Sequence, residues 1–421
     1  MAKIASELQT QMNAQANDEP IPVIIRRKGG VFSAQSILPS SPTIDHAFRL
    51  FPGEACTVNA ADIDTLSQHD DIIEIWPDLP VQAWLNVSVP KIKTPQVWAE
   101  GLKGTGIKLA VVDTGIDESH PDFQGRIMAT KSFVGDSADD DNGHGTHVAS
   151  IVAGSGAKSN GKYVGVAPEA NLYIAKVLRA DGGGSMSGVM SGIEWAVLDQ
   201  QVQIINLSLG GTGSCDGTDA LSTLCDEAVT QAGVVMCVAA GNTGPGTRTV
   251  GPPGCARFVI TVGASSDSDQ IASFSSRGPT SDGRIKPDIA YPGVGIVAAQ
   301  AEGTSLGGVV EPGYISLDGT SMATPHASGV AALMLQANPD LSPQQLKTQM
   351  LAAAVDIGAE PNAQGAGRGD AYQSYLKATD ENIPEPPPPE PPSEPVPPAQ
   401  PQPEPQPGCL ASVASALGLR K

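Results

Sequence analysis

Short, mainly apolar runs rich in β-branched residues alternate with longer amphipathic stretches between residues 86 and 380. The runs predict strands over residues 109–112, 172–177, 204–207, 234–238 and 259–262. The amphipathic stretches predict helices over residues 189–199, 219–231 and 323–337. Apolar strands that alternate with helices predict an α/β fold whose mostly parallel central sheet is flanked by helices on both faces. In such sheets the functional side chains gather at the carboxyl ends of the strands.

The chain before this α/β region has a different pattern. Residues 1–20 are polar and predicted to be disordered, whereas residues 21–85 predict a small α+β module. Asn59 is a predicted helix cap for a helix that runs through residue 68, and residues 72–76 and 81–84 are predicted strands. The order of these elements therefore separates a small first module from the α/β domain of residues 86–380.

The composition changes again near residue 381. Residues 381–408 are rich in proline, interleaved with glutamate and glutamine. Such a segment cannot form a packed core and predicts an extended polyproline II stalk. Residues 409–421 are a short, apolar-leaning helix candidate that ends the chain; a frayed end and a docking tag are the two alternatives for it.

Charge and hydropathy narrow the class of protein. The net charge of −20 argues against nucleic acid as a partner, because phosphate binding needs clustered lysine and arginine. No apolar stretch reaches the roughly 18 residues that a membrane span requires. The start lacks the apolar core of a secretory signal, so a cytoplasmic location is favoured, with export by a non-classical route as the alternative. We expect a monomer.

The six cysteines show no CxxC spacing and so do not predict a metal site. Cys225 and Cys237 lie in apolar contexts that favour buried free thiols. Cys215 lies in a glycine-rich loop and could pair with Cys225 or with Cys255. The spacing does not choose between these two partners.

Two motifs carry an acid and an imidazole. Asp113 ends a predicted strand at a tight turn, where an aspartate is also a common loop cap. His144 stands among small residues at the predicted start of a helix, and His147 lies one turn further on. A zinc site needs a third ligand and usually i, i+4 spacing with an intervening glutamate, which is missing. His147 is therefore predicted to be a hydrogen-bonded structural histidine.

A third motif carries a serine. Ser321 is predicted to lie just before a helix whose first turn contains Pro325, a position where the missing N–H of proline costs nothing. A serine at that place is often only a helix cap. The free N–H groups and the dipole of a helix start also favour a developing oxyanion, however. On its own the motif does not separate these two explanations.

The three motifs together indicate nucleophilic catalysis. A serine hydroxyl needs an imidazole to take its proton, and the imidazole needs a buried carboxylate to hold its tautomer. The order Asp113, His144, Ser321 differs from the orders of trypsin-like barrels and α/β-hydrolases. Asn242 follows another apolar strand in a glycine-rich turn and could donate to an oxyanion, although a turn asparagine is the structural alternative.

These motifs resemble the subtilisin-like serine protease (subtilase) family. The matching segments are residues 112–116 (VDTGI), 144–149 (HGTHVA), 239–242 (AAGN) and 319–326 (GTSMATPH). The resemblance implies a serine endopeptidase with a subtilisin-like fold that acts on proteins and peptides. It implies these roles: Asp113 the orienting acid, His144 the general base, Ser321 the nucleophile and Asn242 the oxyanion donor.

The resemblance also implies where a substrate lies. Two backbone edges would pair with an extended peptide, one made by Ser208, Leu209 and Gly210 and the other by Gly182, Gly183 and Gly184. The primary pocket would be lined by small residues, namely Ala239, Ala240, Gly241 and Gly251. An open pocket of this kind predicts broad specificity with a preference for a large apolar side chain before the scissile bond.

Residues 21–85 resemble the family's inhibitory propeptide, an inhibitor I9-like module with a ferredoxin-like α+β fold whose tail plugs the site. Ser88 begins a segment similar to a mature start, which implies self-cleavage near Leu85–Asn86. Residues 158–163 (KSNGKY) replace a calcium-binding loop of relatives, and Asp122 alone does not make a calcium site. We therefore expect no cofactor requirement and doubt that calcium is needed.

Three other functions are compatible with parts of the sequence. The groove could hold peptides without cleaving them, although all four catalytic positions are filled. The proline-rich stalk could recruit domains with aromatic grooves, which would be compatible with catalysis. An esterase could use the same site, but the two peptide-binding edges favour proteins as substrates.

Overall fold

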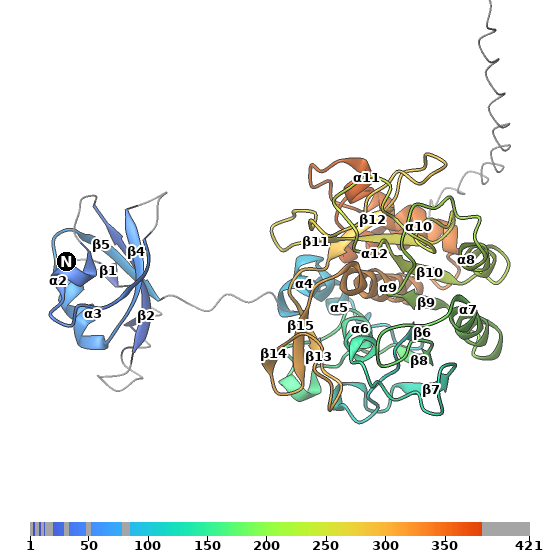
Figure 1. Cartoon of the computed structure of the whole chain (residues 1–421), viewed down its shortest axis with the longest axis horizontal. Helices are drawn as coiled ribbons and strands as arrows, with labels where there is room; N and C mark the ends of the chain where they lie inside the picture. The colour runs from blue at the N-terminus through green and yellow to red at the C-terminus, as the bar shows by residue number, and fades with distance from the viewer. Residues whose placement is uncertain are drawn as a thin grey trace, which may run out of the picture.

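The computed structural model describes residues 3–4, 8–9, 12, 20–28, 33–47, 52–77 and 85–380. The predicted strand 81–84, the stalk and the C-terminal helix candidate lie outside these residues. Within them, a small sheet module precedes a large α/β domain (Figure 1).

The first module is a five-stranded sheet with the order β1-β5-β2-β4-β3. Its elements are β1 (Lys3–Ile4), β2 (Ile21–Arg27), α2 (Ala34–Ile37), β3 (Ile44–Ala47), β4 (Gly53–Val58), α3 (Ala60–Ser67) and β5 (Ile72–Pro77). The pairs β2–β4, β2–β5 and β3–β4 are antiparallel. From β2 onward, the chain order β-α-β-β-α-β is that of the split βαβ arrangement of ferredoxin-like folds.

Two details of this module bear on the sequence predictions. The Asn59 side chain accepts a hydrogen bond from the Asp62 N–H at 2.8 Å, which confirms the predicted cap of α3. Lys3–Ile4 pairs in parallel with β5, so the disorder predicted for residues 1–20 is wrong for these two residues. Leu8 is also buried in the module's core, and its apolar contacts explain why part of this segment is ordered.

The large domain is built on a seven-stranded sheet with the order β12-β11-β10-β9-β6-β8-β7. The strands are β6 (Lys108–Asp113), β7 (Ile127–Ser132), β8 (Asn171–Lys176), β9 (Ile204–Leu207), β10 (Val235–Ala239), β11 (Ile260–Ser265) and β12 (Ile289–Pro292). All neighbouring pairs are parallel. After β6, the chain first adds β7 and β8 on one side of this strand and then adds β9 to β12 on the other side. The strand order therefore reverses beside β6. Ligands of such sheets bind at this kind of position.

Helices cover both faces of this sheet, as the sequence predicts. Val111 points into a core shared with α6 (His144–Ala153) and α9 (Thr320–Ala337). Val112 points into the opposite core, shared with α7 (Met186–Glu194) and α8 (Ala220–Thr230). Figure 1 shows these two pairs of helices on opposite sides of the strands. Because alternate side chains of each strand are buried on opposite faces, the strands are apolar at most of their positions.

Smaller elements complete the domain. A three-stranded antiparallel sheet is formed by β13 (Ile296–Ala299), β15 (Tyr314–Leu317) and β14 (Gly308–Glu311), in that order. The remaining helices are α4 (Leu85–Lys91), α5 (Thr94–Ala99), η1 (Pro121–Phe123), η2 (Ala157–Ser159), η3 (Trp195–Asp199), α10 (Pro343–Ala352), α11 (Pro361–Gln364) and α12 (Ala371–Ala378). In the described part of the chain, no helix combines the length and apolarity needed to cross a membrane.

The structure chooses between the two disulfide partners that the sequence left open. Cys215 is bonded to Cys255, with 6.0 Å between their Cα atoms. Cys225 on α8 and Cys237 on β10 are buried free thiols, as predicted. Burial raises the pKa of the Cys237 thiol to about 12, so this sulfur is unreactive as a nucleophile.

Candidate active site

Loops at the carboxyl ends of neighbouring parallel strands bring the predicted site residues to one edge of the sheet. Asp113 is the last residue of β6, Ser208 follows β9, and Asn242 follows β10 beyond a short turn. The helices α6 and α9 start at the same edge and supply His144 and Ser321. Segments that are far apart in the sequence therefore meet where the strand order reverses.

Asp113 and His144 form the innermost pair of this site. The Asp113 side chain is fully buried, and its Oδ1 lies 2.7 Å from His144 Nδ1. The same oxygen accepts the Thr114 N–H at 2.7 Å, which fixes the carboxylate in place. Since Nδ1–H donates to a carboxylate, Nε2 is the imidazole nitrogen left to accept a proton.

A second buried acid organises the loop in front of His144. Asp140 is only 5% exposed. Its carboxylate oxygens accept three hydrogen bonds, each of 2.8 Å, from the Thr114 hydroxyl and from the backbone N–H groups of Gly143 and Thr146. Thr114 is the neighbour of Asp113, and Gly143 and Thr146 flank His144. Asp140 thus joins the end of β6 to the start of α6. Sequence reasoning missed this residue, because nothing local distinguishes it from neighbouring loop aspartates.

The charges around His144 set its proton affinity. Burial alone would lower the pKa of His144, but the Asp113 carboxylate and its hydrogen bond, together with Asp140, raise it above the ordinary value of about 6.5. A general base must be neutral to accept a proton. We predict that kcat/KM for a peptide substrate rises with pH through a midpoint above about 6.5. A profile with its lower midpoint below that value would contradict this electrostatic description.

His147 has a different environment from His144. It is fully buried, and its Nε2 lies 3.0 Å from the Ile296 carbonyl oxygen and 3.2 Å from that of Ile315. Burial lowers the pKa of His147 to about 3, so the ring is neutral and Nε2–H donates to β13 and β15. The structural role predicted for His147 is confirmed.

Ser321 lies inside the first turn of α9 and not before it, which corrects the predicted helix start. Thr320 opens the helix because its N–H donates to Asn242 Oδ1 at 2.9 Å, a cap that the sequence does not reveal. Pro325 consequently lies within the helix and not in its first turn. Because Pro325 has no N–H, the Ser321 carbonyl lacks its helical donor, and Ser208 Oγ donates to it instead at 2.8 Å.

The Ser321 hydroxyl is held by the loop after β9. Ser321 Oγ donates to the Ser208 carbonyl at 3.0 Å, and no hydrogen bond joins it to His144 in this described region. Hydrogen bonds between catalytic groups are often long or absent without substrate. Ser208 Oγ is itself fixed by Asn206 Nδ2 at 3.0 Å. Ser208 therefore supports the turn of α9 that carries Ser321, in addition to forming a cavity edge.

Asn242 presents a donor at the same turn. Its Oδ1 is occupied by the N–H of Thr320 and, at 3.0 Å, by the Thr320 hydroxyl. These bonds orient the side chain so that Nδ2 faces the cavity, where it has no protein acceptor among the described residues. The Ser321 N–H at the start of α9 has no intrahelical partner either. Asn242 and Ser321 line the same cavity.

The motif resemblance assigns Asn242 the role of an oxyanion donor, and removing one such donor costs about 2.7–4 kcal/mol in the transition state. On this assignment, we predict that Asn242→Ala lowers kcat for peptide hydrolysis by about 10²–10³-fold. KM should change little, because the bond forms with the oxyanion and not with the ground-state carbonyl. Steady-state kinetics on one peptide substrate measure both constants. Thr243→Ala, on the next residue, is the matched control. A rise in KM at constant kcat would assign Asn242 to substrate binding instead.

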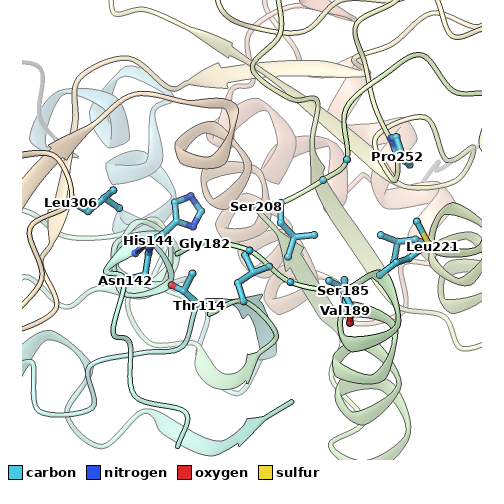
Figure 2. Close-up of a pocket in the computed structure, with 17 residues that line it drawn as sticks. Thr114, Asn142, His144, Gly182, Ser185, Val189, Ser208, Leu221, Pro252 and Leu306 are labelled. Atoms are coloured by element: carbon cyan, nitrogen blue, oxygen red, sulfur yellow. Dashed lines mark hydrogen bonds between the residues drawn. The ribbon is translucent and has the colours of Figure 1, made fainter. Parts of the chain in front are cut away.

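Two adjoining cavities contain the predicted substrate-binding residues (Figure 2). The larger, of about 540 Å³, is lined by both predicted edges and by His144. The smaller, of about 300 Å³, lies between Asn242 and Ser321 and is lined by the residues predicted for the primary pocket, Ala239, Ala240, Gly241 and Gly251. Gly182, Gly183, Gly184, Ser208, Leu209 and Gly210 all line the larger cavity, and Leu209 and Gly210 also line the smaller one.

The larger cavity also has apolar walls that the sequence analysis missed. They are formed by Leu178, Met186, Val189, Leu221 and Leu306. Figure 2 shows Val189 and Leu221 on one side of the cavity and Leu306 on the side of His144. Met186 and Val189 are neighbours on one face of α7. The spacing of Met186 and Val189 in the sequence could have indicated this apolar helix face. Leu221 and Leu306, in contrast, come together only in the folded chain.

The fold and the site together define a serine hydrolase built on a parallel α/β sheet. A family model described as "Subtilase family" (Peptidase S8) matches residues 104–367. The chain belongs to the subtilase family, and it is a subtilisin-like serine endopeptidase. Its resemblance to this family, inferred from the motifs, is thereby confirmed.

Three comparisons show the extent of the similarity. The chain is 41% identical over 336 residues to serine protease AprX of Bacillus subtilis, covering 73% of this chain and 75% of that protein. It is 38% identical to an intracellular serine protease of Paenibacillus polymyxa, covering 70% and 86% of the two chains. A crystal structure of a cold-adapted subtilisin-like serine proteinase superposes with a TM-score of 0.52 and 35% identity, covering 64% of this chain and 88% of that one.

Proposed function

We propose that Asp113, His144 and Ser321 form the catalytic triad of this endopeptidase and that Asn242 is an oxyanion donor. The 2.7 Å contact between Asp113 Oδ1 and His144 Nδ1 carries this proposal, because it leaves Nε2 as the nitrogen that can take a proton. Ser321 on α9 lies across the same edge of the sheet, between Ser208 and Asn242.

Each group then has one step to perform. His144 Nε2 takes the proton of Ser321 Oγ as this oxygen attacks the peptide carbonyl, and Asp113 stabilises the resulting imidazolium. The negative oxygen of the tetrahedral intermediate is held by Asn242 Nδ2 and the Ser321 N–H. His144 then donates its proton to the leaving amine, which releases the first product and leaves an acyl-enzyme. Water, activated in the same way, hydrolyses the acyl-enzyme.

We propose that substrate binds as an extended strand between the two glycine-rich edges, with the side chain before the scissile bond in the cavity beside Ser321. Backbone edges at Gly183 and Leu209 would supply affinity independent of sequence. The small residues Ala239 and Gly251 leave the primary pocket open to a large apolar side chain. Broad specificity with this preference follows.

The test compares chromogenic peptides that differ only in phenylalanine or alanine before the scissile bond. We expect kcat/KM to be about 10–100-fold higher for phenylalanine, within the range that hydrophobic pockets achieve. A serine-directed phosphonate should abolish both activities. Equal cleavage of the two peptides would reject the pocket assignment, and activity that survives the phosphonate would reject the nucleophile.

We propose that residues 21–85 act as an inhibitory propeptide and are removed by self-cleavage near Leu85–Asn86. The ferredoxin-like order of the first module supports this proposal. Leu85 and Asn86 lie at the start of α4, so that turn must open before the bond can pair as an extended strand. Helix ends open at little cost.

The segment after that bond belongs to the core of the large domain. Ser88 is fully buried, and its hydroxyl lies 2.8 Å from His326 Nε2 on α9. His326 Nδ1 lies 2.9 Å from the Met322 carbonyl, so Nδ1–H donates there and Nε2 accepts from Ser88. Processing beyond Ser88 would break this contact. N-terminal sequencing of the mature protein should therefore find a start at or before Ser88.

We propose that the enzyme needs no calcium at Asp122. Asp122 is fully buried, and its oxygens accept the Lys158 N–H at 3.0 Å and the Tyr314 hydroxyl at 2.8 Å. Calcium requires six to eight oxygen ligands, whereas the groups that occupy Asp122 are donors. His120, which also neighbours it, offers no oxygen. The residues present therefore do not fit the metal.

We expect EDTA to change neither the melting temperature nor the half-life of the protein at elevated temperature. Calorimetry with EDTA and with added calcium measures the first, and residual activity measures the second. Tyr314→Phe, which removes one donor to Asp122, is the matched variant and should lose stability in both solutions alike. A melting temperature that falls with EDTA and recovers with calcium would overturn the proposal.

A further inference from the structure

Two strips of backbone that line the cavity beside Ser321 lie against each other. The first strip runs from Leu209 to Thr212 after β9, and the second contains Thr249 and Gly251 before β11. The walls touch, because the Gly211 N–H donates to the Pro252 carbonyl at 2.7 Å. A Cβ built on Gly251 would lie 2.1 Å from the Gly211 carbonyl oxygen. This contact therefore fixes where the first strip lies relative to the second, and so helps to define the shape of the cavity.

The second wall is anchored in the core of the domain. Cys255, which follows this wall, is fully buried, and its carbonyl accepts the Arg284 guanidinium at 2.9 Å. Val250 is buried as well. The strip then continues into the buried strand β11. This wall has little freedom to move by itself.

The first wall is exposed and has few anchors. Residues 210–214 are exposed, and the segment between β9 and α8 has no regular secondary structure. At its start the segment is held by the two hydrogen bonds between Ser208 and Ser321 and by the packing of Leu209 on the core. Beyond the Gly211 bond, the Cys215 carbonyl accepts the Ser281 N–H at 3.0 Å, and the Asp216 carbonyl accepts Arg284 at 2.6 Å. Cys215 then joins this segment covalently to Cys255. The disulfide is thus the covalent link between the exposed wall and the buried wall.

We propose that the Cys215–Cys255 disulfide determines substrate specificity by holding the exposed wall, residues 209–212, against the buried wall of the primary pocket. This proposal rests on the proposed function of that cavity as the pocket for the side chain before the scissile bond. With the disulfide intact, the pocket keeps one width that fits a large apolar side chain. Without the disulfide, the exposed wall fluctuates. Binding of a large apolar side chain then has to order this wall, and the loss of conformational entropy weakens binding.

Reduction provides a chemical means to open this link. A dithiol reductant supplies two electrons: its thiolate attacks Cys215 Sγ, the Cys255 thiolate leaves and takes up a proton, and the second thiol of the reductant releases Cys215. The products are two cysteine thiols and the oxidised dithiol. Cys215 is half-buried beside the exposed strip, whereas Cys255 is fully buried, so attack at Cys215 is favoured. The active enzyme thus has two forms with different pockets.

The disulfide lies outside the reacting groups. Asp113 is on β6, His144 on α6 and Ser321 on α9, all outside the segment between Cys215 and Cys255. Asn242 lies within that segment, but its side chain is held by Thr320 on α9. A disulfide that only stabilised the fold would lower the melting temperature and leave KM unchanged. A disulfide that shapes the pocket changes KM in a way that depends on the side chain before the scissile bond. These two roles are therefore separable by kinetics.

The experiment measures kcat and KM of the oxidised protein, of the protein reduced with dithiothreitol, and of Cys215→Ser/Cys255→Ser. The substrates are the phenylalanine and alanine peptides, at a temperature where all forms are folded by circular dichroism. We expect reduction to raise KM about tenfold for phenylalanine and less than about twofold for alanine, with kcat nearly constant. The double variant should match the reduced protein and not respond to dithiothreitol.

Two controls fix the interpretation. Cys225→Ser, which removes a buried free thiol on α8, should respond to dithiothreitol as the unchanged protein does. Mass spectrometry after thiol alkylation counts the cysteines that reduction has released. If the double variant does not fold, the comparison of the oxidised and reduced forms of the unchanged chain still tests the proposal, because this count shows whether the disulfide was opened. Equal KM changes for both peptides, or none after complete reduction, would overturn the proposal. Failure of the oxidised protein to prefer phenylalanine would instead reject the proposed pocket.

Discussion

Replacing Ser321 with alanine is expected to lower kcat for peptide hydrolysis by about 10⁶-fold and to keep the chain at its full mass. The variant has no hydroxyl to form the acyl-enzyme, so only transition-state stabilisation by the remaining groups persists. The unchanged protein should lose residues 1–85, about 9 kDa of a 43.1 kDa chain of 421 residues. Intact-mass spectrometry and a peptide assay on purified protein measure both effects.

A matched serine substitution and a mixing experiment complete this test. Ser191→Ala, on the exposed face of α7, should be processed and active. Adding a trace of the unchanged protein to Ser321→Ala should restore processing if mature enzyme can cut the precursor of another molecule. Loss of the 9 kDa segment by pure Ser321→Ala would show that another nucleophile performs the maturation.

Asp113→Asn is expected to reduce kcat by about 10⁴-fold while the fold persists. Asp113 Oδ1 accepts hydrogen bonds from both His144 Nδ1–H and the Thr114 N–H. In Asp113→Asn, the amide oxygen can still accept the Thr114 N–H, but His144 no longer has an anionic acceptor for its Nδ1–H. The ring can then carry its proton on Nε2 and cannot accept the proton of Ser321. Steady-state kinetics over a range of pH measure the loss.

The pH profile adds a second readout for Asp113→Asn. The carboxylate of Asp113 is a main cause of the raised pKa of His144, so its removal should move the lower midpoint of kcat/KM to lower pH. Asp199→Asn, an exposed substitution at the end of η3, should change neither kcat nor the midpoint. A fall in kcat without a shift in the midpoint would mean that Asp113 acts by positioning alone.

The architecture was predictable because burial leaves a strong trace in the sequence. Strands covered on both faces are apolar at most positions, and 109–112 and 204–207 were recognised on that ground. Asp113 and Asn242 were candidates because functional residues gather at the carboxyl ends of such strands. His144 and Ser321 needed the combination of motifs, since each alone also fits a structural role.

The start of α9 could not be predicted because it depends on a contact across the fold. The N–H of Thr320 is capped by Asn242, a residue of a different strand loop. The choice of Cys255 over Cys225 as the partner of Cys215 depends in the same way on distances set by the whole domain. The cavity walls at Leu221 and Leu306 are a third example. Local pattern contains no information on such contacts.

The contact between Ser88 and His326 sets a practical limit on protein engineering. A shortened catalytic domain that began after Ser88 would leave His326 Nε2 buried without its hydrogen-bond donor, in the helix that carries Ser321. Affinity tags, fusion partners and circularly permuted ends are therefore best joined upstream of this residue. On the proposed inhibitory role of residues 21–85, a linker at the same site that a second protease can cut would place activation of the enzyme under external control.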